Sequence, residues 1–180
     1  MALDRETVLR VAADFVARRP NATQDEIAAA VGVSRATLHR YFSGRAALLD
    51  ALDQFATAHL REALKAGRGQ EDSAADALRR VVAACQPVSG YLNLLYTQSQ
   101  DFETNQPKKA WAEIDAEVRE LFLRGQRQGE FRPDLNAFWL TEAFFNLMAG
   151  AAWVVSVGGA GRREFTDMVT ELLLRGVSRS

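Results

Sequence analysis

The sequence predicts an all-α protein with about nine helices, in which an N-terminal three-helix head containing a helix-turn-helix is joined by a long fourth helix to a C-terminal helical bundle. Three observations predict this class. Apolar residues recur at helical spacing along most of the chain. No segment convincingly alternates apolar with polar residues, as a half-buried β-strand does. Hydrophobic residues make up 48% of the 180 positions, which is ample for a helical core.

The first helix is predicted over residues 4–18, with Val8, Ala12 and Phe15 on its inner face. Pro20 stops it, because proline lacks the N–H that a continuing helix needs.

The helix-turn-helix is predicted over residues 23–49, TQDEIAAAVGVSRATLHRYFSGRAALL. Thr23 and Glu26 have the spacing of a capping box, whose hydroxyl and carboxylate satisfy free amides at a helix start. Gly32 ends this second helix, since glycine adopts the left-handed conformation without strain. Ser34 is a favoured cap for a third helix that begins at the next residue.

The third helix is predicted to have one buried and one exposed side. Leu38 and Phe42, four residues apart, bury the first. The exposed side carries Arg35, Thr37, His39, Arg40 and Tyr41. No acidic residue lies between Glu26 and Asp50, so positive charge gathers locally although the net charge of the chain is only −1. Such a face suits a phosphate backbone, and the alternative is an ordinary solvated helix face.

DNA affinity comes mainly from phosphate contacts, whereas base edges decide sequence choice. Arg35, in the first turn, can reach the paired acceptors of guanine, and Ala36 can touch a thymine methyl group. Arg45, near the amino end of the fourth helix, can pair with a phosphate. Thr23 and Gln24 can do the same from the second helix, although capping alone explains Thr23 equally well.

The fourth helix is predicted to begin after Ser43 and Gly44 and to end at Gly67 and Gly69. The chain therefore divides into a DNA-binding unit, residues 1–48, and a ligand-binding and dimerisation unit, residues 49–180. Further helices are predicted over residues 73–85, 89–98, 107–128, 135–157 and 163–175. Residues 101–106 are polar and predicted as a loop, and Pro107 suits the first turn of the seventh helix.

The stretch SRATLHRYFSGRAALLDAL resembles the signature of the TetR family of bacterial repressors. Its specific part is an aromatic residue, two small residues and a basic residue, then two further residues and a leucine pair. The matching positions are Ser34, Thr37, Leu38, Tyr41, Phe42, Arg45, Leu48 and Leu49. The resemblance implies that Thr37 and Tyr41 bind phosphates through their hydroxyls and that His39 reaches a phosphate or a base edge. His39 and Arg40 replace aromatic residues that are more usual there. The full set of expected DNA contacts is Thr23, Gln24, Ser34, Arg35, Ala36, Thr37, His39, Arg40, Tyr41 and Arg45.

A homodimer is expected, because one helix-turn-helix binds DNA weakly and two recognition helices about 34–36 Å apart fit successive major grooves. The eighth and ninth helices are the candidates for its interface, since the eighth is apolar on more than one face. The expected contacts are Phe144, Met148, Ala151, Ala152, Phe165, Met168 and Leu172. The alternative is packing within one chain, which must hold for about half of them.

The resemblance also implies a small-molecule effector that binds between the fourth and eighth helices and releases the protein from its operator. Aromatic residues that could line the pocket are Tyr91, Tyr96, Phe102, Trp111, Phe122, Phe145 and Trp153. Ordinary core packing is the alternative for each. Few titratable groups accompany them, Asp115 and Glu142 being the notable ones, so an aromatic or largely apolar effector is favoured.

Other classes find little support in the sequence. An enzyme is disfavoured, because the chain lacks a phosphate-binding loop after a strand, a GxSxG turn and an HExxH helix. With two histidines and one cysteine, neither a metal site nor a cofactor is expected. Cys85 is expected to be a buried thiol in a cytoplasmic protein. Residues 137–157 are apolar but include Glu142 and Asn146, so burial explains them better than a membrane. The remaining alternative is a helical protein-interaction module without sequence-specific DNA binding.

Overall fold

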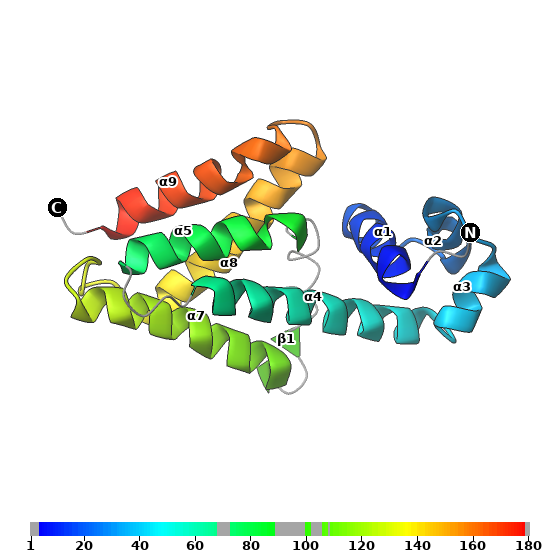
Figure 1. Ribbon diagram of the computed structural model, residues 1–180, viewed down its shortest axis with the longest axis horizontal. Coiled ribbons are helices and arrows are strands. Elements are labelled where there is room, and N and C mark those ends of the chain that lie inside the picture. Colours follow the sequence, from blue (N-terminus) through cyan, green and yellow to red (C-terminus); the bar gives the residue numbers. More distant parts are fainter. Residues whose placement is uncertain (1–3, 68–72, 89–99, 102–105, 108, 179–180) are drawn as a thin grey trace.

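The computed structural model describes residues 4–67, 73–88, 100–101, 106–107 and 109–178. Apart from two strands of two residues each, the regular structure within these ranges is helical, which confirms the predicted fold class. The α-helices are α1 (Arg5–Arg18), α2 (Gln24–Val31), α3 (Arg35–Tyr41), α4 (Arg45–Gly67), α5 (Ala74–Cys85), α7 (Lys109–Arg127), α8 (Ala137–Ser156) and α9 (Phe165–Val177). Two short 3₁₀ helices, η1 (Gln86–Val88) and η2 (Arg162–Glu164), follow α5 and precede α9. Figure 1 shows α1–α3 as a head at one end of the molecule, the remaining helices as a body, and α4 running through both.

Local capping explains where the head helices begin. The backbone N–H of Thr7 donates to Asp4 Oδ1 at 2.8 Å, which caps α1 and lowers the pKa of the Asp4 carboxyl. The head is held together by a core that the three helices and the start of α4 share. Its fully buried members include Val8, Ala12, Val16, Ile27, Leu38 and Leu48.

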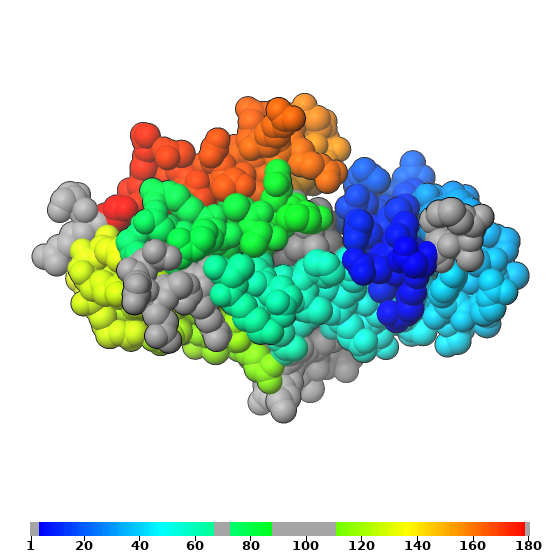
Figure 2. Space-filling model, viewed as in Figure 1, coloured from blue at the N-terminus to red at the C-terminus, as the bar shows by residue number. Residues whose placement is uncertain are grey.

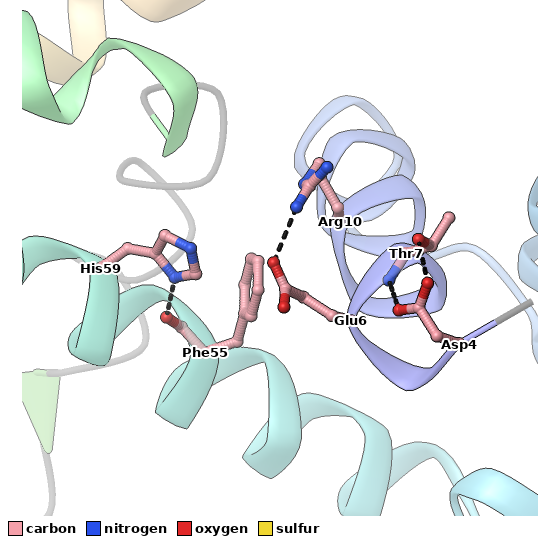
Figure 3. A network of polar contacts seen from close by, with 6 residues as sticks. All are labelled: Asp4, Glu6, Thr7, Arg10, Phe55 and His59. Carbon is pink, nitrogen blue, oxygen red and sulfur yellow. Dashed lines mark hydrogen bonds and ion pairs between the residues drawn. The ribbon is translucent and has the colours of Figure 1, made fainter.

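The side chain of Phe55, on α4, points toward α1 (Figure 3). Its ring lies 4.2 Å from the ring of His59, centroid to centroid, and its carbonyl oxygen lies 2.8 Å from His59 Nδ1. On α1, Arg10 donates to Glu6 at 2.7 Å, and Figure 3 places this ion pair across from Phe55. α4 therefore carries contacts to the head along its first half and continues into the body.

The body surrounds an aromatic core contributed by α7, α8 and the loop between them. The Phe122 ring lies 6.0 Å from that of Phe131 and 6.5 Å from that of Phe144, and all three side chains are fully buried. Glu130, in the α7–α8 loop, accepts hydrogen bonds from the backbone N–H groups of Ala74 at 2.9 Å and Ala75 at 3.1 Å. A side chain far away in the sequence thus caps the start of α5.

Two of the predicted connections differ from the structure. Gln100–Asp101 (β1) and Gln106–Pro107 (β2) pair as short antiparallel strands at the ends of the stretch predicted as a loop. Pro107 therefore belongs to β2 and not to the first turn of α7, which begins at Lys109. A two-stranded pair tolerates this proline because each strand is an edge and does not need every N–H. The helix predicted over residues 89–98 lies outside the described residues.

One described helix, α8, is long and apolar enough to cross a membrane by length and composition alone. Of its most apolar 18-residue stretch, 44% is buried inside the protein. Phe144 and Met148 on this helix are completely buried in the body core. The core helix of a soluble protein passes the same test, so the finding is weak support for a membrane span. Among the described residues, no three His, Cys, Asp or Glu side chains are grouped so that they could hold a metal ion.

Candidate DNA-binding surface

The predicted capping box starts α2 and is confirmed by the structure. The backbone N–H of Thr23 donates to Glu26 Oε2 at 2.7 Å, and the N–H of Glu26 donates to Thr23 Oγ1 at 3.3 Å. The backbone N–H and the hydroxyl of Thr23 both donate to the Glu26 carboxylate, and these two hydrogen bonds lower its pKa. Gly32 closes the helix in the left-handed region with φ of 79°, as predicted. The Thr23 side chain therefore has a structural role whether or not it also contacts DNA.

Helix α3 is capped by Ser34, whose Oγ accepts from the backbone N–H of Thr37 at 3.1 Å. The hydroxyls of Ser34 and Thr37 also lie 2.9 Å apart in a hydrogen bond. Leu38 and Phe42 are buried, as predicted, and fix the orientation of the helix. The side chains left on the outside are Arg35, Ala36, His39 and Arg40, which are exposed, and Thr37 and Tyr41, which are half-buried.

This outward face lies at the end of the molecule that is farthest from the body. Figure 1 places α3 at the tip of the head, and Figure 2 shows the cyan surface of this region exposed there. Seven of the ten residues predicted to contact DNA belong to α3 or its amino-terminal cap, so the structure brings them together on one tip. This geometry lets α3 enter a groove while the body stays clear of the duplex.

Arg35 has an ionic partner that the sequence analysis missed. Its Nη1 lies 3.2 Å from Oδ2 of Asp25, in the first turn of α2. Asp25 directly precedes Glu26 and so lies outside the segment between Glu26 and Asp50 that contains no acidic residue. Residues ten apart in the sequence meet here because the turn at Gly32 sets α2 and α3 at an angle. The helix-turn-helix pattern was the signal that could have revealed the pair.

Arg45 is not a free cation. Its guanidinium donates hydrogen bonds to the backbone carbonyl oxygens of Pro20 and Ala22, in the connection between α1 and α2. The expectation of a simple phosphate contact is therefore revised, because these bonds turn the side chain toward the head. Gln24 is half-buried, and its buried Nε2 has no hydrogen-bond partner among the residues that the structure describes.

Comparison with known proteins identifies the family. Residues 16–52, which include all of this surface, match the model of the bacterial regulatory proteins of the tetR family. Over 175 residues the chain is 30% identical to the HTH-type transcriptional regulator NfxB of Pseudomonas aeruginosa, which covers 96% of this chain and 94% of that protein. The chain belongs to the TetR family. It is accordingly a DNA-binding transcriptional regulator, and the resemblance inferred from residues 34–52 is confirmed.

Two further matches come from a TetR-family repressor. The HTH-type transcriptional repressor LfrR of Mycolicibacterium smegmatis is 29% identical over 178 residues, covering 96% of this chain and 89% of the repressor. The crystal structure of LfrR from Mycobacterium smegmatis in complex with proflavine shares the fold, with a TM-score of 0.73, 24% identity, and coverage of 98% of this chain and 97% of that chain. These relatives are regulators and not enzymes.

In this TetR-family chain, most of the residues expected at a dimer interface lie inside one protomer. Phe144 and Met148 are 0% exposed and Phe165 is 1% exposed, so a second copy cannot reach them. Ala151 and Ala152 are also buried. Met168 is half-buried, whereas Leu172 is exposed. The alternative of packing within the chain therefore holds for five of the seven, because α8 is covered on several sides by α7 and α9. Large apolar side chains that the structure does expose on α8 are Phe138, Trp139 and Trp153.

The residues expected to line an effector pocket fall into three groups. Tyr91, Tyr96 and Phe102 lie outside the described residues. Trp111, Phe122 and Phe145 are buried, and the Trp111 and Phe145 rings pack with centroids 4.8 Å apart. Trp153 is exposed and lines a cleft between the head and the body.

Asp115 on α7 and Glu142 on α8, the two acids noted beside the expected pocket residues, lie near one another. Burial is the main influence on the Asp115 carboxyl and raises its pKa, and the nearby charge of Glu142 acts in the same direction. Arg119, which forms an ion pair with Asp115, opposes this shift.

Proposed function

We propose that this protein is a homodimeric TetR-type repressor that binds a palindromic operator and is released by a small molecule. The observation that carries the proposal is the outer face of α3. It presents Arg35 and Arg40 beside small and hydroxylated side chains, on a capped helix at the tip of the head. In this proposal residues 1–48 form the DNA-binding domain, residues 49–180 bind the ligand and dimerise, and the protein acts in the cytoplasm.

The proposed DNA contacts follow from exposure and reach. α3 enters the major groove, where Arg35 in its first turn reads a guanine and Ala36 allows the backbone to come close. Arg40, Thr37 and Tyr41 bind phosphates along the groove, and His39 contacts either a phosphate or a base edge. The remaining predicted contacts, Thr23, Gln24 and Ser34, place helix amino termini near the backbone of the duplex. Arg45 contributes mainly by holding the start of α4 against the head.

The dimer interface is proposed on the side chains of α8 and α9 that one protomer leaves exposed. Trp139 and Leu172 are 63% and 64% exposed, which is unusual for large apolar side chains. Gly150 lies on the outer side of α8 with no atom within 4 Å of the position that a Cβ would take, so a partner helix can approach closely there. Leu172→Glu is expected to fold, because the side chain is exposed, and to shift the mass measured by light scattering from dimer to monomer.

An effector that is aromatic or largely apolar is proposed. LfrR, a repressor with the same fold, was crystallised with proflavine. The buried cluster of Trp111, Phe122 and Phe145 supports an aromatic environment in the body of this chain as well.

Selection of bound duplexes from a random library by the purified protein tests the proposal directly. We expect an enriched palindrome with half-sites about 10–10.5 base pairs apart or slightly more, as two recognition helices in successive major grooves require. Titration at two salt concentrations then measures the phosphate contribution. If no sequence is enriched and only weak, salt-sensitive binding remains, the protein is a helical interaction module and the repressor proposal is wrong.

A further inference from the structure

Arg5, the first residue of α1, lies beside the carboxyl end of α3. Its guanidinium carbon lies 5.4 Å from the centroid of the Phe42 ring, and Phe42 is the residue that ends α3. The ring of Tyr41, the last residue of α3, lies 6.2 Å from that same ring, centroid to centroid. Arg5 and Tyr41 are therefore both neighbours of one ring at the edge of the outward face of α3.

Arg5 has no carboxylate partner in the part of the chain that the structure describes. The two acids next to it in the sequence are engaged elsewhere on α1. Asp4 accepts hydrogen bonds from the backbone N–H and the hydroxyl of Thr7, both at 2.8 Å, and Glu6 pairs with Arg10 at 2.7 Å (Figure 3). Arg5 thus carries a positive charge that is exposed to solvent and not offset by a contacting acid.

The edge of the head where α3 ends and α4 begins lacks the cation that the sequence predicted there. Arg45 was expected to bind a phosphate from this position, but its guanidinium donates to the carbonyl oxygens of Pro20 and Ala22 inside the head. Only two residues separate Phe42 from the start of α4. Because Arg5 lies over the Phe42 ring, it brings a positive charge from α1 to this edge.

An arginine held over an aromatic ring is well suited to bind a phosphate. The face of the ring attracts the guanidinium charge but uses none of its N–H donors. These donors can therefore pair with two oxygens of one phosphate, a geometry that favours arginine over lysine. Contact with the Phe42 ring also restricts the Arg5 side chain before DNA arrives, so less conformational entropy is lost on binding.

We propose that Arg5 binds a phosphate of the DNA backbone beside the groove that α3 enters, and that it supplies the charge expected from Arg45. This contact rests on the proposed entry of α3 into the major groove. A phosphate contact carries no sequence information. Arg5 therefore adds affinity for every duplex and leaves the choice of bases to side chains of α3 such as Arg35.

Salt titration of binding to a random-sequence duplex is the first test, with the full-length protein. We expect Arg5→Gln to lower the slope of log affinity against log salt by about one unit for each bound protomer. Binding at about 0.1 M salt should weaken by at least about fivefold. Arg5→Lys keeps the charge and should keep most of the slope. Equal losses of slope in Arg5→Lys and Arg5→Gln would overturn the proposal.

Arg18→Gln is the matched control for the loss of one charge from α1. Arg18 is also exposed and forms no ion pair among the described residues, but it lies at the other end of α1, where it lines the cleft between the head and the body. Both proteins should fold, because both side chains are exposed, and Arg18→Gln should change the slope by less than about 0.3 unit. Equal slopes in the two variants would overturn the proposal. So would a larger loss of slope in Arg45→Gln than in Arg5→Gln.

The selected operator supplies a second readout. Arg5→Gln should enrich the same palindrome as the unaltered protein, and a change of preferred base would contradict a phosphate contact. Single phosphates of the operator are then replaced by uncharged methylphosphonates. One position in each half-site should weaken binding of the unaltered protein by about fivefold and that of Arg5→Gln by less than about twofold.

The absence of any such position would overturn the contact. If selection enriches no palindrome, the repressor proposal fails instead, and the titration on the random-sequence duplex still decides the role of Arg5.

Discussion

Asp25 and Arg35 join the first turns of the two helices of the helix-turn-helix, with carboxylate and guanidinium 3.2 Å apart. Both side chains are well exposed, at 63% and 68%, so the pair adds little to the stability of the fold. The ion pair matters because it sets the position of the Arg35 side chain. The carboxylate holds the guanidinium at the amino end of α3, where the protein is proposed to read a base.

Asp25→Asn should therefore alter sequence choice more than stability. We expect the unfolding midpoint to stay nearly constant, while the preferred base opposite Arg35 loses enrichment in a repeated library selection. Arg35→Gln should relax the base preference at the same position of the selected duplex. Asp50→Asn, which removes an exposed acid from α4, controls for the general gain in affinity that follows loss of a negative charge. Unchanged enrichment in Asp25→Asn would show that the pair does not position Arg35.

Arg45→Gln should cost stability and affect the salt dependence of DNA binding only weakly. The substitution removes charged donors from the carbonyl oxygens of Pro20 and Ala22, so we expect a loss of about 2 kcal/mol in urea unfolding. Arg40→Gln should do the opposite. It should leave stability unchanged and lower the slope of log affinity against log salt by about one unit. If Arg45→Gln lowers that slope as much as Arg40→Gln does, Arg45 is a phosphate contact after all.

Glu130→Ala should destabilise the body by about 1–2 kcal/mol in urea unfolding. Two backbone N–H groups at the start of α5, those of Ala74 and Ala75, would lose their acceptor, and the helix would lose a favourable negative charge at its amino end. Glu171→Ala is the matched control, because it breaks an exposed ion pair with Arg175 on α9 and should cost well under about 1 kcal/mol. A similar loss in both variants would contradict the capping role.

Gly125→Ala should be destabilising although alanine favours helices. A Cβ at this position of α7 would lie 2.2 Å from the ring of Phe131, which is completely buried and cannot move aside freely. We expect a cost of about 1–3 kcal/mol, read as a lower thermal midpoint. Gly176→Ala on α9 meets no atom within 4 Å and should not lower the midpoint. Unchanged stability in Gly125→Ala would mean that the loop holding Phe131 shifts easily.

Cys85 should make the stability of the protein fall at high pH. Burial raises the pKa of its thiol to about 12, so the folded chain keeps the proton while the unfolded chain loses it above about pH 9. Stability from this group is therefore complete below about pH 9 and declines between pH 9 and 12, by about 1.4 kcal/mol for each pH unit. Urea unfolding of Cys85→Ala should show a correspondingly smaller decline. Equal declines in the two proteins would contradict this account, as would rapid alkylation of the native thiol at pH 8.

Short-range chemistry explains why so much of the fold was predictable. Thr23, Ser34 and Ser73 cap helices through groups within three residues, so the sequence around them suffices to place a helix start. Outward and inward positions of α3 followed from helical spacing in the same way.

Apart from Pro107, which lies in β2 and not in α7, the incorrect or missing predictions concern contacts between distant segments. Helix α8 is apolar on most sides, and its sequence does not distinguish the side that packs against α7 and α9 from the side that is exposed. Phe144 was therefore expected at a dimer interface, although it is buried within one protomer. The direction of the Arg45 side chain, the cap that Glu130 places on α5 and the pairing of Asp25 with Arg35 depend on how helices meet, which a local pattern does not contain.

Because helix α4 is long and joins the body to the head, a small tilt of its body end produces a larger displacement of the head. It is continuous over 23 residues and so extends about 34 Å. Arg45 attaches its amino end to the head, and its other end contacts α5 and α7 in the body. A tilt of about 5° at the body end displaces the head by about 3 Å, close to the spacing of about 3.4 Å between successive base pairs. In a two-fold dimer the two heads would move in directions related by rotation about the symmetry axis. A rearrangement of body side chains too small to change the fold is thus sufficient to put two recognition helices one base step out of register.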